Sequence, residues 1–157
     1  MPNLIGIAPI SKPAFILGKL SVLGCCLFFL LKIHDPNRML YDGPANRAAA
    51  IVLLLAGLVV MALALMKLGI STRVGLSDDI TRLRTAGIYR LSRNPLYLGA
   101  FALCLASCCY SLHWMNFLLA FVGAAVHHRI VLAEERFLEA KFGDEFRRYQ
   151  ARVRRYL

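Results

Sequence analysis

Four apolar stretches, separated by polar and charged segments, run along the chain. The first covers residues 13–31, with Lys19 near its start and Lys32 directly after its end. The second covers residues 48–66 and contains no charged residue. A helix needs about 20 predominantly apolar residues to cross the hydrocarbon core of a bilayer, and spans of about 17 are tolerated. Both stretches therefore predict membrane-spanning helices.

Two further apolar stretches lie in the C-terminal half. Residues 96–112 are uncharged and follow Asn94 and Pro95, which suit the N-cap and the first position of a helix. Residues 114–133 are apolar at first and then contain two adjacent histidines and an arginine. The pattern predicts an all-α fold, a multi-pass membrane bundle of four transmembrane helices, in a single domain over residues 1–157.

The residues after the fourth stretch are polar and rich in arginine, yet apolar side chains still recur among them at helical spacing. These are Phe142, Phe146, Tyr149, Val153 and Tyr156. We therefore expect an amphipathic cytosolic helical tail over residues 134–157, interrupted where Gly143 ends one helix and Asp144 begins another. Such a tail either anchors the chain at the membrane surface or covers a cytosolic pocket, and the pattern fits both arrangements equally.

The composition also requires a membrane. Of the 157 residues, 59% are hydrophobic and only 18% are charged, and the formal net charge is +10. A soluble domain of this size cannot hide so much apolar surface from water, because its ratio of surface to volume is too high. The positive charge lies beside the apolar stretches, which indicates anionic membrane lipids rather than nucleic acid. The five cysteines have no metal-ligand spacing, so we expect no metal site.

The basic residues predict the orientation of the bundle. Arginines are frequent in the segment between the second and third stretches and in the tail, whereas the turn at residues 111–113 has none. Lysine and arginine accumulate on the cytoplasmic side of a membrane. Both termini and the segment over residues 67–95 are therefore predicted to face the cytoplasm, and any chemistry is expected at that end.

The start of the third stretch carries residues that a helix start does not require. Capping explains Asn94 and Pro95, but not Arg93, Tyr97 or Gly99. An arginine beside a helix N-terminus favours a carboxylate or phosphate, because the unpaired N–H groups and the guanidinium both attract anions. Tyr97 adds a hydroxyl within one turn, and Gly99 allows a close approach. This edge predicts an anion site.

The corresponding edge of the fourth stretch carries ionisable side chains. His127 lies seven residues before Glu134, and His128 seven before Glu135, so each pair falls on one helical face. Two adjacent carboxylates at a membrane boundary are costly unless they are solvated or paired. They fit either a binding site or the ordinary polar beginning of the cytosolic part of a helix.

The two edges together form a longer pattern. Its residues are Gly87, Tyr89, Arg93, Asn94, Pro95, Tyr97 and Gly99, followed after an apolar hairpin by Arg129, Ile130, Glu134, Glu135, Leu138, Phe142, Gly143, Phe146 and Tyr149. This pattern resembles the isoprenylcysteine carboxyl methyltransferase family and the wider group that contains the phospholipid N-methyltransferases. The resemblance covers about half of the chain, from Gly87 onwards, whereas the first two stretches match only as hydrophobic helices.

The resemblance implies that S-adenosyl-L-methionine binds at the cytosolic ends of the last two spans, beneath the tail. The implied cofactor-binding residues are Tyr89, Arg93, Asn94, Pro95, Tyr97, Gly99, Glu134 and Glu135. Arg93 suits the carboxylate of the cofactor, and the two glutamates suit its ammonium and ribose hydroxyls. The carboxyl methyltransferases typically carry histidine where this chain has Asn94, which argues against a prenylcysteine acceptor more than against the cofactor.

The expected reaction is in-line methyl transfer to a lipophilic acceptor that enters sideways from the bilayer. The expected catalytic residues are Arg93, His128 and Glu135, the last two as candidate general bases for an amine or hydroxyl acceptor. A hydrogen-bonded boundary residue is an equal alternative for His128. Two other functions stay open: a non-enzymatic anchor or subunit that binds anionic lipid or a partner through its basic tail, and a membrane reductase. The sequence identifies neither the acceptor nor the oligomeric state.

Overall fold

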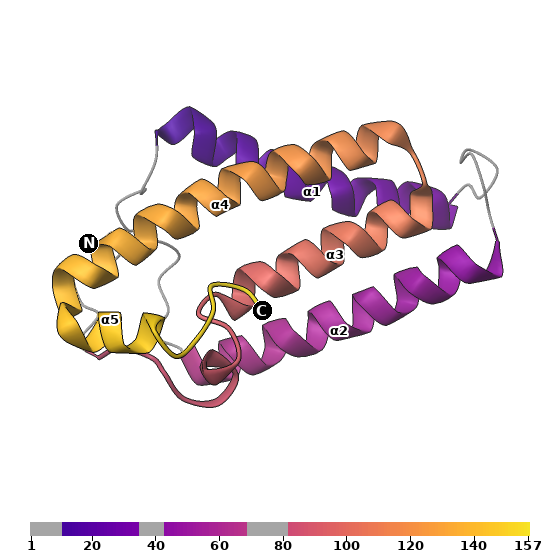
Figure 1. Ribbon diagram of the computed structural model, residues 1–157. Coiled ribbons are helices and arrows are strands. Elements are labelled where there is room, and N and C mark those ends of the chain that lie inside the picture. Colours follow the sequence, from indigo (N-terminus) through magenta and orange to yellow (C-terminus); the bar gives the residue numbers. More distant parts are fainter. Residues whose placement is uncertain (1–10, 35–42, 69–81) are drawn as a thin grey trace, which may run out of the picture.

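The computed structural model describes residues 11–34, 43–68 and 82–157 (Figure 1). The elements are α1 (Lys12–His34), α2 (Pro44–Leu68), the short 3-10 helix η2 (Gly87–Arg90), α3 (Pro95–Ser111), α4 (Trp114–Phe142) and α5 (Asp144–Gln150). These described ranges contain helices and no strands, which confirms the all-α fold.

Three helices are long and apolar enough to cross a membrane by length and composition. They are Lys12–Lys32, Pro44–Lys67 and Trp114–Phe142. The remaining predicted span is α3, an apolar helix of 17 residues, which at about 1.5 Å per residue reaches about 25 Å and lies at the lower limit for a span. Helix length therefore supports three of the four predicted spans, and α3 is shorter than the others.

Large apolar side chains cover the outer surfaces of α1 and α2. Leu23 and Val52 are each 65% exposed, and Met66 is 77% exposed. Contact between such surfaces and water is unfavourable, whereas the hydrocarbon of a bilayer is an apolar solvent. The exposed surface, rather than the interior, thus identifies the chain as a membrane protein.

The four long helices alternate in direction along the sequence (Figure 1). Helix α3 packs between α2 and α4, while α1 packs against both α4 and α3. The start of α3 and the end of α4 consequently lie at one end of the bundle, together with α5 and the C-terminus (Figure 1). We call this the α5 end. The two edges that stand out in the sequence therefore meet there.

Buried polar side chains connect α1, α3 and α4 nearer the opposite end. The Asn116 side chain is fully buried and donates from Nδ2 to Ser107 Oγ at 2.9 Å and to Ser111 Oγ at 2.8 Å. Ser107 Oγ donates to the Cys25 carbonyl oxygen at 2.6 Å. A buried polar group is costly unless it is hydrogen-bonded, so these bonds favour one relative position of the three helices.

Helices α2 and α3 lie in close contact at Gly99. A Cβ atom on Gly99 would lie 2.4 Å from Met61 Cγ and 2.9 Å from the Gly57 carbonyl oxygen. Side chains in packed proteins do not approach so closely, so only glycine fits here. The close approach expected at Gly99 is therefore made by α2.

Replacing Gly99 with alanine should destabilise the protein by roughly 1–3 kcal/mol, as expected when a methyl group is forced into a packed contact. Thermal unfolding in detergent measures the effect. Gly123→Ala is the matched control, because a Cβ there would come no closer than 3.4 Å, to Ser21 Cβ. We expect the control to unfold at the wild-type temperature or slightly above it. Equal unfolding temperatures for the two variants would contradict the proposed contact.

The C-terminal tail differs from its prediction. Helix α4 continues to Phe142, and the chain then turns at Gly143, whose φ of 51° favours glycine. Helix α5 has only 7 residues, and residues 151–157 are not helical. The predicted break at Gly143 is confirmed, but the prediction of a helical tail over residues 134–157 is wrong beyond Gln150.

The apolar residues of the tail pack against the chain itself. A buried cluster of Phe146, Tyr149 and Val153 is surrounded by Leu83, Leu138 and Phe142. These side chains have the spacing that suggested an amphipathic helix, yet they face the end of the bundle. The tail is therefore a docked segment at the α5 end rather than a helix that presents its apolar face to the membrane surface.

Candidate active site

The non-helical C-terminal segment lies against the start of α3. The backbone N–H of Arg93 donates to the Arg154 carbonyl oxygen at 3.0 Å. Its guanidinium donates from Nη1 to the carbonyl oxygens of Gln150 at 3.2 Å and Val153 at 2.8 Å. Arg93 therefore fixes the path of residues 150–154 through their main-chain acceptors.

Arg93, Glu135 and Arg155 form an ion cluster that joins the start of α3, helix α4 and the tail. Nε and Nη2 of Arg93 each lie 3.0 Å from Oε1 of Glu135. Nε and Nη2 of Arg155 lie 2.9 and 2.8 Å from Oε2 of the same carboxylate. Glu135 is only 5% exposed, and a buried carboxylate is tolerated only when it is paired. The structure thus brings the predicted residues Arg93 and Glu135 into direct contact.

Asn94 and Pro95 occupy the N-cap and the first helical position of α3, as predicted. The Asn94 side chain nevertheless makes no capping hydrogen bond. Its Nδ2 donates to Glu135 Oε1 and to the Arg155 carbonyl oxygen, both at 3.3 Å. The explanation of Asn94 by capping alone is therefore wrong, because its amide belongs to the ion cluster.

Tyr97 and Glu134 form a second pair, one helical turn further into α3. Tyr97 Oη donates to Glu134 Oε1 at 2.9 Å, and no other hydrogen-bond or ion-pair partner of Glu134 lies within the described part of the chain. The Tyr97 ring lies 5.8 Å from the His127 ring, and His127 donates from Nδ1 to the Gly123 carbonyl oxygen at 2.7 Å. Glu134 therefore keeps one carboxylate oxygen for a further donor.

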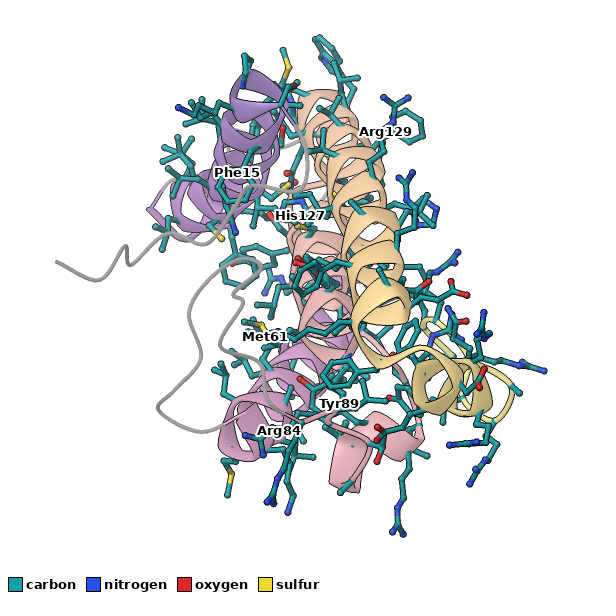
Figure 2. The ribbon with its side chains drawn as sticks, turned by 90° about the vertical axis from the view of Figure 1, so that its left-hand side faces the viewer. Phe15, Met61, Arg84, Tyr89, His127 and Arg129 are labelled. Carbon is teal, nitrogen blue, oxygen red and sulfur yellow. The ribbon has the colours of Figure 1, made fainter. Side chains whose placement is uncertain are left out.

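His128 faces the tail. Its Nδ1 lies 2.9 Å from Tyr156 Oη, and the Tyr156 ring meets Phe101 edge-on at 5.6 Å. The partner of His128 among the described residues is thus Tyr156, not Glu135, which shares its helical face. Arg129 is exposed and points away from the bundle (Figure 2).

Tyr89 lies in η2, before the start of α3, and is buried at the α5 end (Figure 2). Its carbonyl oxygen accepts a hydrogen bond from Tyr149 Oη at 2.6 Å. Burial raises the pKa of Tyr89 and of Tyr149 to about 12, so both phenols stay protonated at neutral pH and Tyr149 remains a donor. The main chain of Tyr89 therefore helps to hold α5 in place.

Sequence reasoning missed two members of the site, Arg155 and Tyr156. Both stand in the tail, where Arg155 resembles the neighbouring Arg152 and Arg154. Only the path of the non-helical tail distinguishes Arg155 from Arg152 and Arg154, because it turns Arg155 towards Glu135 while the other two stay exposed. No signal in the sequence separates these arginines.

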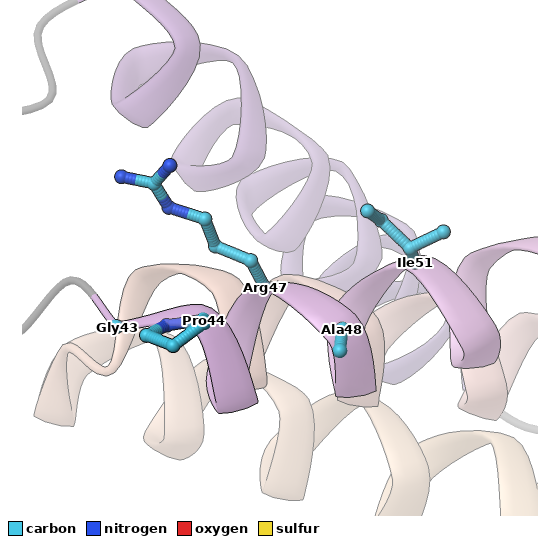
Figure 3. Close-up of a pocket in the computed structure, with 5 residues that line it drawn as sticks. All are labelled: Gly43, Pro44, Arg47, Ala48 and Ile51. Atoms are coloured by element: carbon cyan, nitrogen blue, oxygen red, sulfur yellow. The ribbon is translucent and has the colours of Figure 1, made fainter.

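Two pockets lie at opposite ends of the bundle. One, of about 450 Å³, lies at the start of α2 and is lined by Gly43, Pro44, Arg47, Ala48 and Ile51 (Figure 3). It contains none of the predicted site residues. The other, of about 410 Å³, lies at the α5 end and is lined by Leu132, Glu135, Arg136, Glu139, Gln150 and Arg155. This second pocket adjoins the ion cluster, so it belongs to the candidate site.

The charges of the site favour a ligand that carries both signs. Two guanidinium groups share the single carboxylate of Glu135, which leaves one positive charge in excess. Hydrogen bonding to Glu135 raises the pKa of Arg155 above its usual value, so it stays charged. Such an excess attracts an anion where water is partly excluded. The free oxygen of Glu134 favours a cation or a hydroxyl nearby.

Similarity to known proteins extends over both edges of the site. The family described as phospholipid methyltransferase matches residues 45–145, which include both edges of the site. An uncharacterised protein of Haemophilus influenzae (strain ATCC 51907 / DSM 11121 / KW20 / Rd) is 41% identical over 49 residues, or 28% of this chain and 78% of that protein. No solved structure matches. Since the family match covers more than half of the chain, the protein belongs to the phospholipid methyltransferase family.

Proposed function

We propose that this protein is a methyltransferase that uses S-adenosyl-L-methionine and acts on a lipophilic acceptor in the membrane. The proposal is carried by the presence of both signs of charge at one end of the bundle. Arg93 and Arg155 supply an excess positive charge there, and Glu134 supplies a half-buried carboxylate. The cofactor carries a carboxylate, an ammonium and a sulfonium. Its charges therefore complement those of the site.

The exposure of the two arginines assigns them different tasks. The Arg93 side chain is 10% exposed and is engaged by Glu135 and by tail carbonyls, whereas the Arg155 side chain is 35% exposed. Arg155 would thus hold the carboxylate of the cofactor, and Arg93 would keep Glu135 and the tail in position. Glu134, oriented by Tyr97, would accept hydrogen bonds from the ribose hydroxyls of the cofactor.

Methyl transfer needs alignment more than proton chemistry. The bound donor supplies an electrophilic sulfonium methyl group, which the nucleophile of the acceptor takes up as S-adenosylhomocysteine leaves. Tyr97 and Glu134 come from different helices, so together they orient a ligand between α3 and α4.

A base is needed only when the acceptor is an amine or a hydroxyl. Two guanidinium groups stabilise the charged form of Glu135, which makes it a poor proton acceptor. His128 is the better of the two predicted bases, since its contact is the neutral phenol of Tyr156.

We assign the α5 end to the cytoplasmic side, because the exposed arginines of the tail lie there.

Titration of the purified protein with S-adenosylhomocysteine tests the cofactor assignment. We expect the wild type to bind, and both Tyr97→Phe and Glu134→Gln to weaken binding about tenfold or more, because a hydrogen bond to a charged group is lost. Tyr110→Phe, which changes a tyrosine near the other end of α3, should bind like the wild type. Absence of binding by the wild type, both in detergent and in lipid nanodiscs, would refute the assignment.

A further inference from the structure

The pocket at the α5 end contains more charge than the ion cluster accounts for. Besides Glu135 and Arg155, it is lined by Arg136, Glu139 and Gln150. On α4, Leu132, Glu135, Arg136 and Glu139 have the spacing of one helical face. The tail supplies the facing wall through Gln150 and Arg155. A volume of about 410 Å³ is in the range of small-molecule sites.

The additional charges of this pocket are poorly neutralised by the protein. Arg136 donates from Nε to the Leu132 carbonyl oxygen of its own helix at 3.3 Å, and no carboxylate pairs with it among the described residues. Glu139 lies 3.8 Å from Arg147, whose guanidinium instead binds Asp144 at 2.8 Å. Exposed pairs at such distances contribute little. Arg136 and Glu139 therefore present unlike charges to the pocket.

We propose that this pocket binds a zwitterionic group, with its anion between Arg136 and Arg155 and its amine at Glu139. The guanidinium of Arg155 is already turned into the pocket by Glu135, so it needs no rearrangement to meet an anion. Arg136 and Glu139 lie nearly one turn apart on α4, a separation that suits an anion and an amine of one small group. A purely anionic or purely cationic ligand would leave one of them unmatched.

Two sources share this chemistry: the amino-acid end of the methyl donor and the zwitterionic head group of a lipid. The first source rests on the proposed function, whereas the second does not. Three probes separate them. S-adenosylhomocysteine carries the amino-acid end, 5′-methylthioadenosine lacks it but keeps the nucleoside and the thioether, and glycerophosphoethanolamine carries only the head group.

Binding of each probe is measured by titration of wild type, Arg136→Gln and Glu139→Gln in a non-ionic detergent. Arg152→Gln, which changes an exposed tail arginine outside the pocket, is the matched control. We expect the two pocket variants to weaken binding of the zwitterionic probe about tenfold, while the control binds like the wild type. Thermal unfolding verifies that all variants fold, as the surface positions of Arg136 and Glu139 lead us to expect.

Weaker binding of S-adenosylhomocysteine with unchanged binding of 5′-methylthioadenosine supports the proposal and assigns the pocket to the donor. Weaker binding of glycerophosphoethanolamine alone supports it and assigns the pocket to a lipid head group. The proposal is overturned if the two pocket variants bind both zwitterionic probes like the wild type. It is also overturned if these variants lose equal affinity for S-adenosylhomocysteine and for 5′-methylthioadenosine.

Failure of the proposed cofactor and failure of the pocket give different results. If the wild type binds glycerophosphoethanolamine but not S-adenosylhomocysteine, the proposed cofactor fails while the pocket stands. If Tyr97→Phe weakens binding of S-adenosylhomocysteine while Arg136→Gln and Glu139→Gln do not, the proposed cofactor stands and the pocket proposal fails.

Discussion

Replacing Glu135 with glutamine should abolish methyl transfer and lower the free energy of unfolding by about 3–5 kcal/mol, the loss typical of removing one partner from a buried ion pair. The carboxylate accepts hydrogen bonds from Arg93 and Arg155 and is 5% exposed. A glutamine amide would turn an N–H group towards one of these guanidinium groups. Both positive charges would then lie together without a counter-charge.

Two companion variants distinguish disruption of the ion cluster from the loss of an ordinary surface carboxylate. Glu145→Gln changes an exposed residue of α5 and should unfold like the wild type. In the double variant Glu135→Gln and Arg155→Gln, one of the two uncompensated charges is removed, so its loss of stability should be smaller than the sum of the single losses. Strictly additive losses in urea unfolding would contradict a coupled cluster.

Ending the chain after Gln150 should abolish binding of S-adenosylhomocysteine, with a loss of at least about 100-fold, because several hydrogen bonds to charged groups disappear together. The deletion removes the Val153 carbonyl that accepts from Arg93, the Arg155 guanidinium that binds Glu135, and the Val153 side chain of the buried cluster. Equilibrium dialysis with labelled ligand measures the loss.

Shorter changes in the tail locate the effect. Removing only Leu157, which is 76% exposed, should leave binding unchanged. Tyr156→Phe removes the hydroxyl that meets His128 but keeps the ring against Phe101, so it should alter the pH dependence of turnover more than ligand affinity. Full binding by the truncated chain would show that the tail is no part of the site.

The helices were largely predictable because a helix that crosses a bilayer needs a long apolar run, which is visible in the sequence. The uncharged run at residues 48–66 predicted α2 (Pro44–Leu68) to within a few residues. The conformation of the tail was not predictable. Apolar spacing indicates only that side chains are buried, and Val153 is buried although its segment of the chain is not helical. Gly99 predicted a close approach, which α2 makes, but a glycine does not show in the sequence whether a helix or a ligand approaches it.

The composition of the site was predictable in part. The spacing of Arg93 and Glu135 placed opposite charges at two helix edges, and the structure joins them directly. Their mutual pairing was not foreseen, since a ligand and a neighbouring side chain satisfy a charge equally well. Arg155 was not foreseen as a site residue either, because its contact depends on a tertiary path that begins only after α5 ends.

Transfer of label from methyl-labelled S-adenosylmethionine into an organic-soluble product is the most direct test of a methyl-transfer site built around the ion cluster. Membranes that contain the wild-type protein should form such a product above the level of membranes without it. Membranes with an equal amount of folded Glu135→Gln protein should not. Absence of a labelled product with the wild type, or equal labelling by wild type and variant, would contradict the role assigned to Arg93, Glu135 and Arg155.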